Sequence, residues 1–273
     1  MQAMERSVSI RTPDGYTLAG IAVDAEGASK LAILCHGINS DKQEYLSMFP
    51  KLAARLAESH VSSIRFDFRG HGESSGKSQD FDVVGQLIDL STVVRWSDTQ
   101  YKGGFLSKAF VGVSFGAPPG IFLSATGTPF SSISLVAPVL SYSRTFLNPE
   151  TKWAKASFNE CGFEQVLKVG YLLLDGKFRV SARLLEEMKL LHPETVVRTI
   201  KPPVLLIHGS GDGMVPFQVS EEIGHKTPNI EIRILKDMDH GLFIVGDDEG
   251  RSQRSIDLED KVLGFIVEHI RQY

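Results

Sequence analysis

The 273-residue sequence is poor in cysteine and tryptophan, with two residues of each. So few cysteines exclude a disulfide framework, and a chain of this length can bury an adequate core without one. Cys35 ends an apolar run at 31–35, where a buried free thiol packs as a small hydrophobic group. We therefore expect both cysteines to be reduced, with a single Cys35–Cys161 disulfide as the alternative.

Long runs of one residue class are also missing. No stretch approaches the roughly 18 apolar residues of a membrane-spanning helix, and the first ten residues lack the apolar segment of a signal peptide. Lys and Arg number 29 and Asp and Glu 33, with a net charge of −4 and no basic run of the kind that binds nucleic acid. We expect a cytoplasmic protein without stable membrane insertion or a nucleic-acid partner, and its oligomeric state is left open.

From residue 31 onward, short apolar runs alternate with longer helical patterns. This alternation predicts an α/β fold, in which helices cover both faces of a parallel sheet. The expected strands are 8–11, 18–23, 31–35, 61–66, 109–113, 132–136, 204–208 and 230–235. The expected helices are 45–59, 82–96, 115–124, 218–226 and 255–272.

Residues 141–200 interrupt the alternation, with helical patterns such as 178–191, no clear strand and many aromatic residues. We interpret this stretch as an inserted helical cap, and residues 1–140 and 201–273 as the core domain. Its aromatic side chains form either a small core of the cap or the wall of an apolar pocket. Phe146 and Trp153 are candidates for the second role.

The segment Gly112-Val113-Ser114-Phe115-Gly116 joins a predicted strand to a predicted helix. In that setting a G-x-S-x-G sequence is typical of a nucleophile elbow, whereas alone it would be a chance turn. The sharp turn projects the serine hydroxyl from the sheet, and the glycines allow neighbouring backbone to approach closely. The helix that follows points its amino-terminal dipole toward a developing anion. We interpret Ser114 as a nucleophile.

A serine nucleophile needs an adjacent base, and that base needs an orienting carboxylate. Asp212 follows one predicted strand and His240 follows the last one. Because the carboxyl ends of parallel strands lie along one edge of a sheet, we expect both side chains beside Ser114. The histidine could instead be an exposed loop residue, and Asp212 a turn former. The alternative acids are Asp237 and Asp239.

The sequence His36-Gly37-Ile38 follows the predicted strand at 31–35. The backbone N–H groups of Ile38 and Phe115 are candidate donors of an oxyanion hole. We expect His36 to brace this loop by hydrogen bonding rather than to take part in chemistry. Other polar residues expected to be structural are Asp67, Arg69, His71 and a core histidine, His208.

Five motifs occur in order: the His-Gly loop, Asp67-Phe-Arg-Gly-His-Gly-Glu-Ser74, the elbow, a Gly-x-x-Asp-x-x-Val-Pro stretch around Asp212, and a late His-Gly. With them the sequence resembles the α/β-hydrolase superfamily from about residue 8 onward, and most of all its monoglyceride-lipase, serine-aminopeptidase and cinnamoyl-esterase branch. The resemblance implies an eight-stranded, mostly parallel sheet with a cap inserted after the sixth strand. It also implies Ser114 as nucleophile, His240 as general base and then acid, and Asp212 as the orienting acid.

One feature departs from the family pattern. Small or helix-forming residues usually follow the elbow, whereas Pro118 and Pro119 follow it here. If the helix begins at Phe115, these prolines lie deep enough to lose an intrahelical hydrogen bond. We therefore expect a distorted helix start that retains the Phe115 N–H.

These observations predict a serine hydrolase of the carboxylesterase and lipase class that uses no cofactor and no metal. The expected substrate is a small-molecule carboxylic ester with a small to medium apolar acyl or aryl group, cleaved through an acyl-enzyme. Met214 and Val215, with the two aromatic residues of the cap, are expected to contact it. The alternatives are a thioesterase, a serine aminopeptidase, or a non-catalytic hydrolase-like binding protein.

Overall fold

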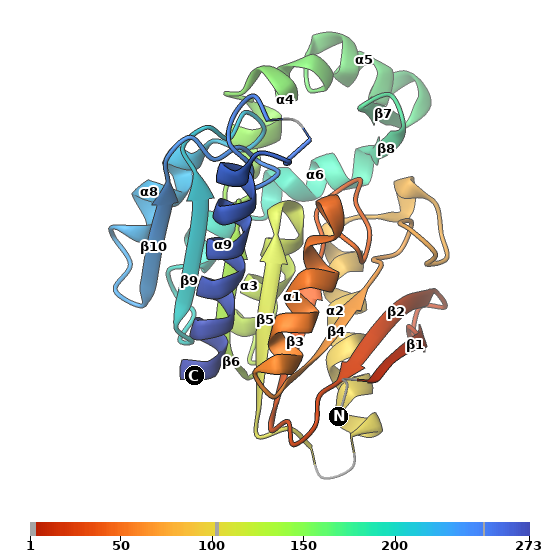
Figure 1. Cartoon of the computed structure of the whole chain (residues 1–273). Coiled ribbons are helices and arrows are strands. Elements are labelled where there is room, and N and C mark those ends of the chain that lie inside the picture. The colour runs from red at the N-terminus through yellow and green to blue at the C-terminus, as the bar shows by residue number, and fades with distance from the viewer. Residues whose placement is uncertain (1–3, 102–103, 248) are drawn as a thin grey trace.

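The computed structural model describes residues 4–101, 104–247 and 249–273, and within them eight strands form one central sheet (Figure 1). These strands are β1 (Met4–Arg11), β2 (Thr17–Asp24), β3 (Lys30–Cys35), β4 (Val61–Phe66), β5 (Ser107–Val113), β6 (Phe130–Val136), β9 (Val204–Gly209) and β10 (Ile230–Leu235). Their order is β1-β2-β4-β3-β5-β6-β9-β10; β2 is antiparallel to both neighbours and the other neighbouring pairs are parallel. The predicted eight-stranded, mostly parallel sheet is confirmed.

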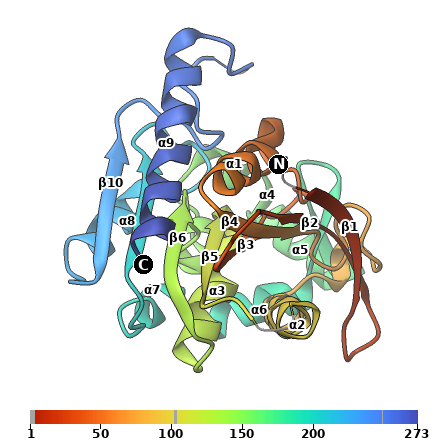
Figure 2. The same ribbon diagram turned by 60° about the horizontal axis from the view of Figure 1, so that its bottom comes forward.

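Helices cover both faces of this sheet (Figure 2). α1 (Met48–Glu58) and α9 (Gln253–Gln272) pack together on one face, where their apolar side chains share a core with the strands. α2 (Val83–Gln100), α3 (Ala117–Ala125) and α8 (Phe217–Gly224) contribute to a second core on the other face. The central strands β3, β5 and β9 have nearly continuous apolar sequences, as strands covered on both faces do, which is why their positions could be predicted. None of the helices in the described ranges is long and apolar enough to cross a membrane.

The segment between β6 and β9 forms a cap above the carboxyl ends of the central strands (Figure 1). It opens with a π-helical turn at Ser143–Leu147. Its further elements are α4 (Lys152–Ser157), α5 (Glu160–Val169), β7 (Tyr171–Leu174), β8 (Phe178–Ser181), α6 (Ala182–Leu190) and α7 (Pro193–Val196). The insertion after the sixth strand is confirmed. Both cysteines are free: Cys35 is buried at the end of β3, and Cys161 is exposed on α5.

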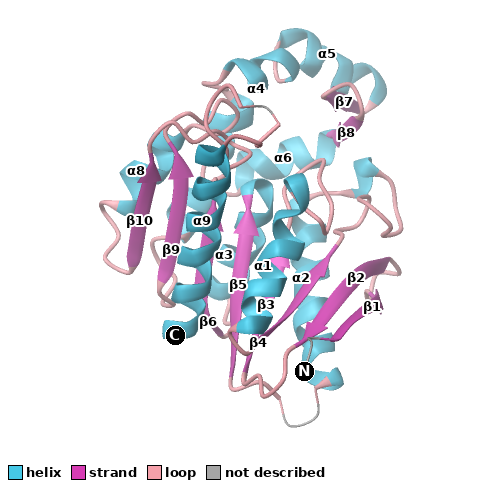
Figure 3. Cartoon of the chain, viewed as in Figure 1, coloured by secondary structure: helices cyan, strands magenta, loops and turns pink. Residues whose placement is uncertain are grey.

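The cap is not purely helical, which corrects two expectations: that residues 141–200 hold no strand and that 178–191 is one helix. β7 and β8 pair as an antiparallel hairpin (Figure 3). Its turn is Asp175-Gly176, where φ is 50° and 68°, as tight hairpin turns require. α6 begins only after Ser181, whose Oγ accepts a hydrogen bond from the Leu184 N–H at 3.2 Å. The Asp-Gly pair was the available sequence signal.

The helix predicted at 45–59 is also shorter than expected. Its first residues, Tyr45–Ser47, form a single 3-10 turn, and the α-helix begins at Met48. Leu46 and Ser47 have φ values of 46° and 60°, which a continuous right-handed helix does not allow.

The helix after Ser114 begins later than the sequence suggests, and its prolines therefore lie in the first turn of the helix. A 3-10 turn covers Ser114–Gly116, and α3 starts at Ala117. Pro118 and Pro119 therefore occupy the second and third positions of α3, where an N–H group has no acceptor within the helix. Within α3 itself, counted from Ala117, the prolines therefore cost no hydrogen bond, and the donor that they fail to supply concerns only the Phe115 carbonyl of the preceding turn.

The Phe115 carbonyl obtains its hydrogen bond from a neighbouring helix. Proline has no N–H, so neither Pro118 nor Pro119 can donate to this oxygen. Instead the buried Gln86 side chain on α2 donates from Nε2 at 3.2 Å. This contact couples α2 to the turn that carries Ser114.

Replacing Gln86 by Leu removes that donor and leaves a buried carbonyl unpaired. Because the Gln86 Oε1 that is removed is itself buried without a partner, part of this cost is offset, and we expect the free energy of unfolding to fall by about 1 kcal/mol, measured by urea denaturation. Arg95→Gln, at an exposed position of the same helix, should change it by less than about 0.5 kcal/mol. A Gln86→Leu variant as stable as the wild type would show that this contact does not contribute.

Candidate active site

Ser114 lies in a sharp turn between β5 and α3, at the carboxyl edge of the sheet. Its φ is 51°, a left-handed conformation that is strained for a residue with a side chain. Glycine is required on both sides: a Cβ on Gly116 would collide with the carbonyl oxygen of Cys35, and one on Gly112 would lie 2.7 Å from the Ala117 Cα. The turn therefore holds Ser114 against the end of β3.

Ser114, His240 and Asp212 form a continuous chain of hydrogen bonds. Ser114 Oγ lies 3.1 Å from His240 Nε2, and His240 Nδ1 lies 2.7 Å from Asp212 Oδ2. Asp212 follows β9 and His240 follows β10, so three separate strand ends supply the set. Asp239, an alternative acid, instead accepts the backbone N–H of Phe243 at 2.9 Å. The structure thus brings together the three residues that the sequence analysis selects.

The buried Asp212 carboxylate accepts hydrogen bonds on both oxygens. Oδ1 accepts the N–H groups of Met214 and Val215, each at 2.8 Å, while Oδ2 also lies 3.0 Å from His208 Nε2. Burial by itself would raise the pKa of this carboxyl. The neighbouring His240 and His208 outweigh that effect and hold the pKa of Asp212 well below its usual range. The carboxylate is therefore ionised at neutral pH.

His240 is surrounded by carboxylates. Burial lowers the pKa of its imidazole, but Asp212, Glu44 and Asp239 together raise that pKa above its usual value. The positively charged form of His240 is therefore stabilised in this site, with Nε2 directed at Ser114.

The loop that follows β3 lies directly against the nucleophile candidate: a Cβ on Gly37 would be 3.1 Å from the Ser114 Cβ. Gly37 donates its N–H to Glu44 Oε2 at 2.8 Å, and Asn39 donates its N–H to His71 Nε2 at 3.2 Å. Within the described ranges, the Ile38 N–H between them has no hydrogen-bond partner. This N–H group therefore remains available next to Ser114; we call residues 36–44 the oxyanion loop after the role expected for it.

Two buried histidines brace the oxyanion loop. His36 Nε2 accepts the Phe68 N–H at 3.0 Å, and its Nδ1 lies 2.7 Å from the Gly37 carbonyl oxygen. Burial lowers the pKa of His36 to about 4 and that of His71 to about 3. Both rings are neutral near pH 7, so each can accept a backbone hydrogen bond. These contacts are structural, as the sequence analysis expects.

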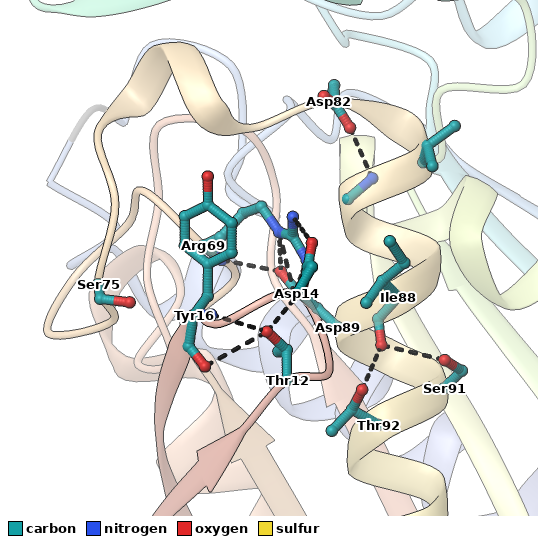
Figure 4. Close-up of polar contacts among 12 residues, drawn as sticks. Thr12, Asp14, Tyr16, Arg69, Ser75, Asp82, Ile88, Asp89, Ser91 and Thr92 are labelled. Carbon is teal, nitrogen blue, oxygen red and sulfur yellow. Dashed lines mark hydrogen bonds and ion pairs between the residues drawn. The ribbon is translucent and has the colours of Figure 1, made fainter.

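The loop that follows β4 is anchored by ion pairs (Figure 4). Arg69 contacts Asp89 of α2 at 2.7 Å and Asp14 of the β1–β2 turn at 2.6 Å. On the same loop, Asp67 accepts a hydrogen bond from the Lys42 ammonium at 2.7 Å. Because Lys42 belongs to the oxyanion loop, these pairs hold the ends of β3 and β4 as one unit.

A cavity of about 610 Å³ opens above Ser114, with walls from both the core and the cap. All four candidate substrate contacts line it: Met214 and Val215 from the loop after β9, and Phe146 and Trp153 from the cap. Their contact with a substrate stays a prediction.

The wall of this cavity also carries charge of mainly one sign. Its carboxylates belong to Glu44, Asp175 and Asp239, and no lysine or arginine of the described residues lines it. Asp175, at the tip of the cap hairpin, accepts hydrogen bonds from Trp153 Nε1 at 3.0 Å and from Asn39 Nδ2 at 3.4 Å. The hairpin therefore connects the cavity tryptophan to the oxyanion loop.

Sequence reasoning missed Glu44 and Asp175 as site residues. The carboxylate of Glu44 reaches back to Gly37 because the backbone turns sharply at its own φ of 56°. Nothing in the local sequence marks that turn. The Asp-Gly pair marks a hairpin but not where its tip lies. Within the described ranges, no cluster of three or more His, Cys, Asp or Glu side chains could hold a metal ion.

In a comparison with protein families, the model of the alpha/beta hydrolase family aligns with residues 32–250. Among curated proteins, two uncharacterized proteins of Mycobacterium tuberculosis strains are each 25% identical over 222 residues, covering 80% of this chain. The aligned region spans 66% of the length of those relatives.

Solved structures with similar folds include two esterases. The Pyrococcus furiosus esterase Pf2001 has a TM-score of 0.69 at 21% identity, covering 99% of this chain and 93% of the other. Est1E of Butyrivibrio proteoclasticus, with ferulic acid bound, has a TM-score of 0.75 at 19% identity, covering 97% and 99%. At these identities the likeness shows a shared fold.

Gly116→Ala tests the close approach that places Ser114. The new methyl group meets backbone oxygens that cannot move aside, so we expect a loss of about 1–3 kcal/mol or more in unfolding free energy, seen as a lower melting temperature. Gly264→Ala is the matched control, because its Cβ meets open space on α9. It should stabilise the protein by up to about 1 kcal/mol. Equal melting temperatures of the two variants would contradict the argument.

Proposed function

The chain belongs to the α/β-hydrolase family, and from this premise we propose that it is a serine hydrolase of the carboxylesterase and lipase class. One observation carries the proposal: Ser114 Oγ, His240 and Asp212 are connected by hydrogen bonds of 3.1 and 2.7 Å. Such a connection activates a hydroxyl that is otherwise a weak nucleophile. A buried polar set is also an energetic liability in a protein that only binds, which disfavours a non-catalytic role.

In the proposed acylation step, Ser114 Oγ attacks the ester carbonyl carbon while His240 Nε2 takes its proton. The carbonyl π electrons move to the oxygen, and the N–H groups of Ile38 and Phe115 donate hydrogen bonds to the resulting oxyanion. Asp212 balances the charge of the imidazolium. The intermediate then re-forms its carbonyl, the bond to the leaving alcohol breaks, and His240 gives its proton to that oxygen.

Deacylation follows the same path with water as the nucleophile. His240 takes one proton from the water as its oxygen bonds to the acyl carbon, and returns a proton to Ser114 Oγ as the acyl-enzyme bond breaks. The products are a carboxylic acid and an alcohol, and the enzyme is restored without a cofactor.

The cavity wall supports a neutral ester with a small to medium apolar acyl or aryl group. Met214, Val215, Phe146 and Trp153 supply apolar surface of the kind that holds such groups. The ferulic acid bound to the similarly folded Est1E is an aryl acid of this size class.

Charge on the wall separates the alternatives. The phosphate groups of a coenzyme A thioester would face carboxylates and find no lysine or arginine among the described lining residues, so this substrate is disfavoured. A serine aminopeptidase is the second candidate, because the same carboxylates would attract a substrate amine.

The first experiment is hydrolysis of p-nitrophenyl esters from acetate to long acyl chains, with wild type and Ser114→Ala side by side. We expect the variant to lose at least about 10³-fold in kcat, since the nucleophile itself is removed. The chain-length profile measures the usable depth of the cavity.

Controls distinguish the candidates. Unfolding of the Ser114→Ala variant should match the wild type, and an acyl-coenzyme A and an aminoacyl p-nitroanilide are assayed in parallel. Hydrolysis of the anilide alone would replace the esterase proposal by the aminopeptidase one. Ester hydrolysis that survives in Ser114→Ala would contradict Ser114 as the nucleophile.

The pH dependence follows from His240. The general base works only when unprotonated, so kcat/KM should rise with pH. Since the pKa of His240 is raised from 6.5, the midpoint of this rise should lie above pH 6.5. A rate profile measured between pH 5 and about 9 checks this. An activity that is flat below neutrality would rule out His240 as the base.

A further inference from the structure

Asp212 is held by a second histidine that the proposed mechanism does not use. His208, the next-to-last residue of β9, is completely buried, and its Nε2 lies 3.0 Å from Asp212 Oδ2. The same oxygen lies 2.7 Å from His240 Nδ1. Two imidazole rings therefore share one carboxylate oxygen.

The far side of the ring indicates which nitrogen of His208 carries hydrogen. His208 Nδ1 lies 2.7 Å from the hydroxyl of Ser220 on α8, and Ser220 is also completely buried. If Nε2 carried no hydrogen, its lone pair would face the Asp212 carboxylate, so Nε2 is the donor. With the hydrogen on Nε2, Nδ1 is left to accept the hydrogen of the Ser220 hydroxyl.

We propose that His208 is a positioning residue. It fixes the Asp212 carboxylate and, by accepting part of the charge on Oδ2, sets the basicity of His240. The proposal rests on the proposed serine hydrolase function. The N–H groups of Met214 and Val215 hold Oδ1, and the two histidines hold Oδ2, so the carboxylate is fixed at both ends. Each hydrogen bond that Oδ2 accepts reduces the charge it presents to the other donor. The His208 bond therefore moderates the stabilisation that Asp212 gives to protonated His240.

The other charges that face His240 come from elsewhere and do not depend on His208. Glu44 lies in the oxyanion loop and Asp239 precedes His240 in the chain, and both raise the pKa of His240. Ser220 adds no charge on the α8 side. When the His208 donor is lost, the charge on Oδ2 is directed at His240 alone. The pKa of His240 should then rise, and the activity should need a higher pH.

The test compares three variants in the p-nitrophenyl ester assay. The double variant His208→Leu/Ser220→Ala removes the donor without leaving a buried hydroxyl unpaired. His208→Gln keeps an amide N–H near the position of Nε2 and is the conservative rescue. His225→Gln changes an exposed histidine just after α8 and controls for the loss of an imidazole as such.

We expect the double variant to lose about 10- to 100-fold in kcat, since a small misplacement of catalytic groups has effects of that order. KM should change by less than about twofold, because no substrate contact is removed. The midpoint of the rise in kcat/KM with pH (the acid limb of the profile) should move up by about 0.5–1 pH unit. His208→Gln should keep the wild-type limb. A kcat loss without a shifted limb would mean a merely structural role and overturn the proposal, as would an unchanged kcat.

A second measurement does not need activity. Nitrogen-15 NMR of the imidazole rings should find a proton on Nε2 of His208 in the wild type, and a higher pKa for His240 in the double variant. A proton on Nδ1 of His208 alone overturns the proposal. If the wild type hydrolyses no ester, the proposed function fails, and the NMR result still decides how His208 contacts Asp212.

Discussion

The site depends on one close approach of backbone to backbone, between Gly116 and the end of β3. The carbonyl oxygens of Cys35 and His36 occupy the space that a side chain at position 116 would need. The chain continues from His36 directly into Gly37 and Ile38, so this approach also sets the separation between Ser114 and the oxyanion loop. The left-handed φ of Ser114 is a local cost that the packed sheet edge offsets. The relative position of the proposed nucleophile and the proposed oxyanion donors is thus a property of the core rather than of either loop alone.

Histidines at the carboxyl edge of the sheet differ in protonation because their surroundings differ. For His36 and His71 burial dominates, and their pKa values of about 4 and 3 keep them neutral while they accept backbone hydrogen bonds. For His240 the neighbouring carboxylates outweigh burial, and its pKa is raised. The bracing rings therefore keep one protonation state through the pH range in which His240 titrates. The bracing of the loop and the proton transfer proposed for His240 therefore depend on different histidines, although their side chains are chemically identical.

The features that could be predicted are those encoded by neighbours in the chain. Apolar runs locate the central strands such as β3, β5 and β9, and the glycines around Ser114 mark the elbow within five residues. The cap hairpin was missed because the helical pattern of α6 extends, in the sequence, into residues that pair as β8. The role of Glu44 could not be predicted, because its carboxylate meets Gly37 only after the backbone turns at positive φ. The late start of α3 was hidden for a similar reason: the 3-10 turn before it follows from packing against β3 rather than from helix propensity.

The cap contacts both loops that position the proposed reacting groups. Thr151 donates its hydroxyl hydrogen to the Met214 carbonyl oxygen at 3.0 Å, beside the loop of Asp212, and Asp175 accepts the Asn39 side chain of the oxyanion loop. The groups proposed to break and form bonds come from strand ends of the core, and core loops also supply most of the cavity wall, to which the cap adds Phe146, Trp153 and Asp175. A change in a cap residue that faces the cavity therefore alters the shape offered to a substrate while the Ser114–His240 hydrogen bond keeps its supports in the core. For the proposed function, changes in Phe146 or Trp153 could therefore alter which acyl or aryl group fits without moving the groups proposed to activate Ser114.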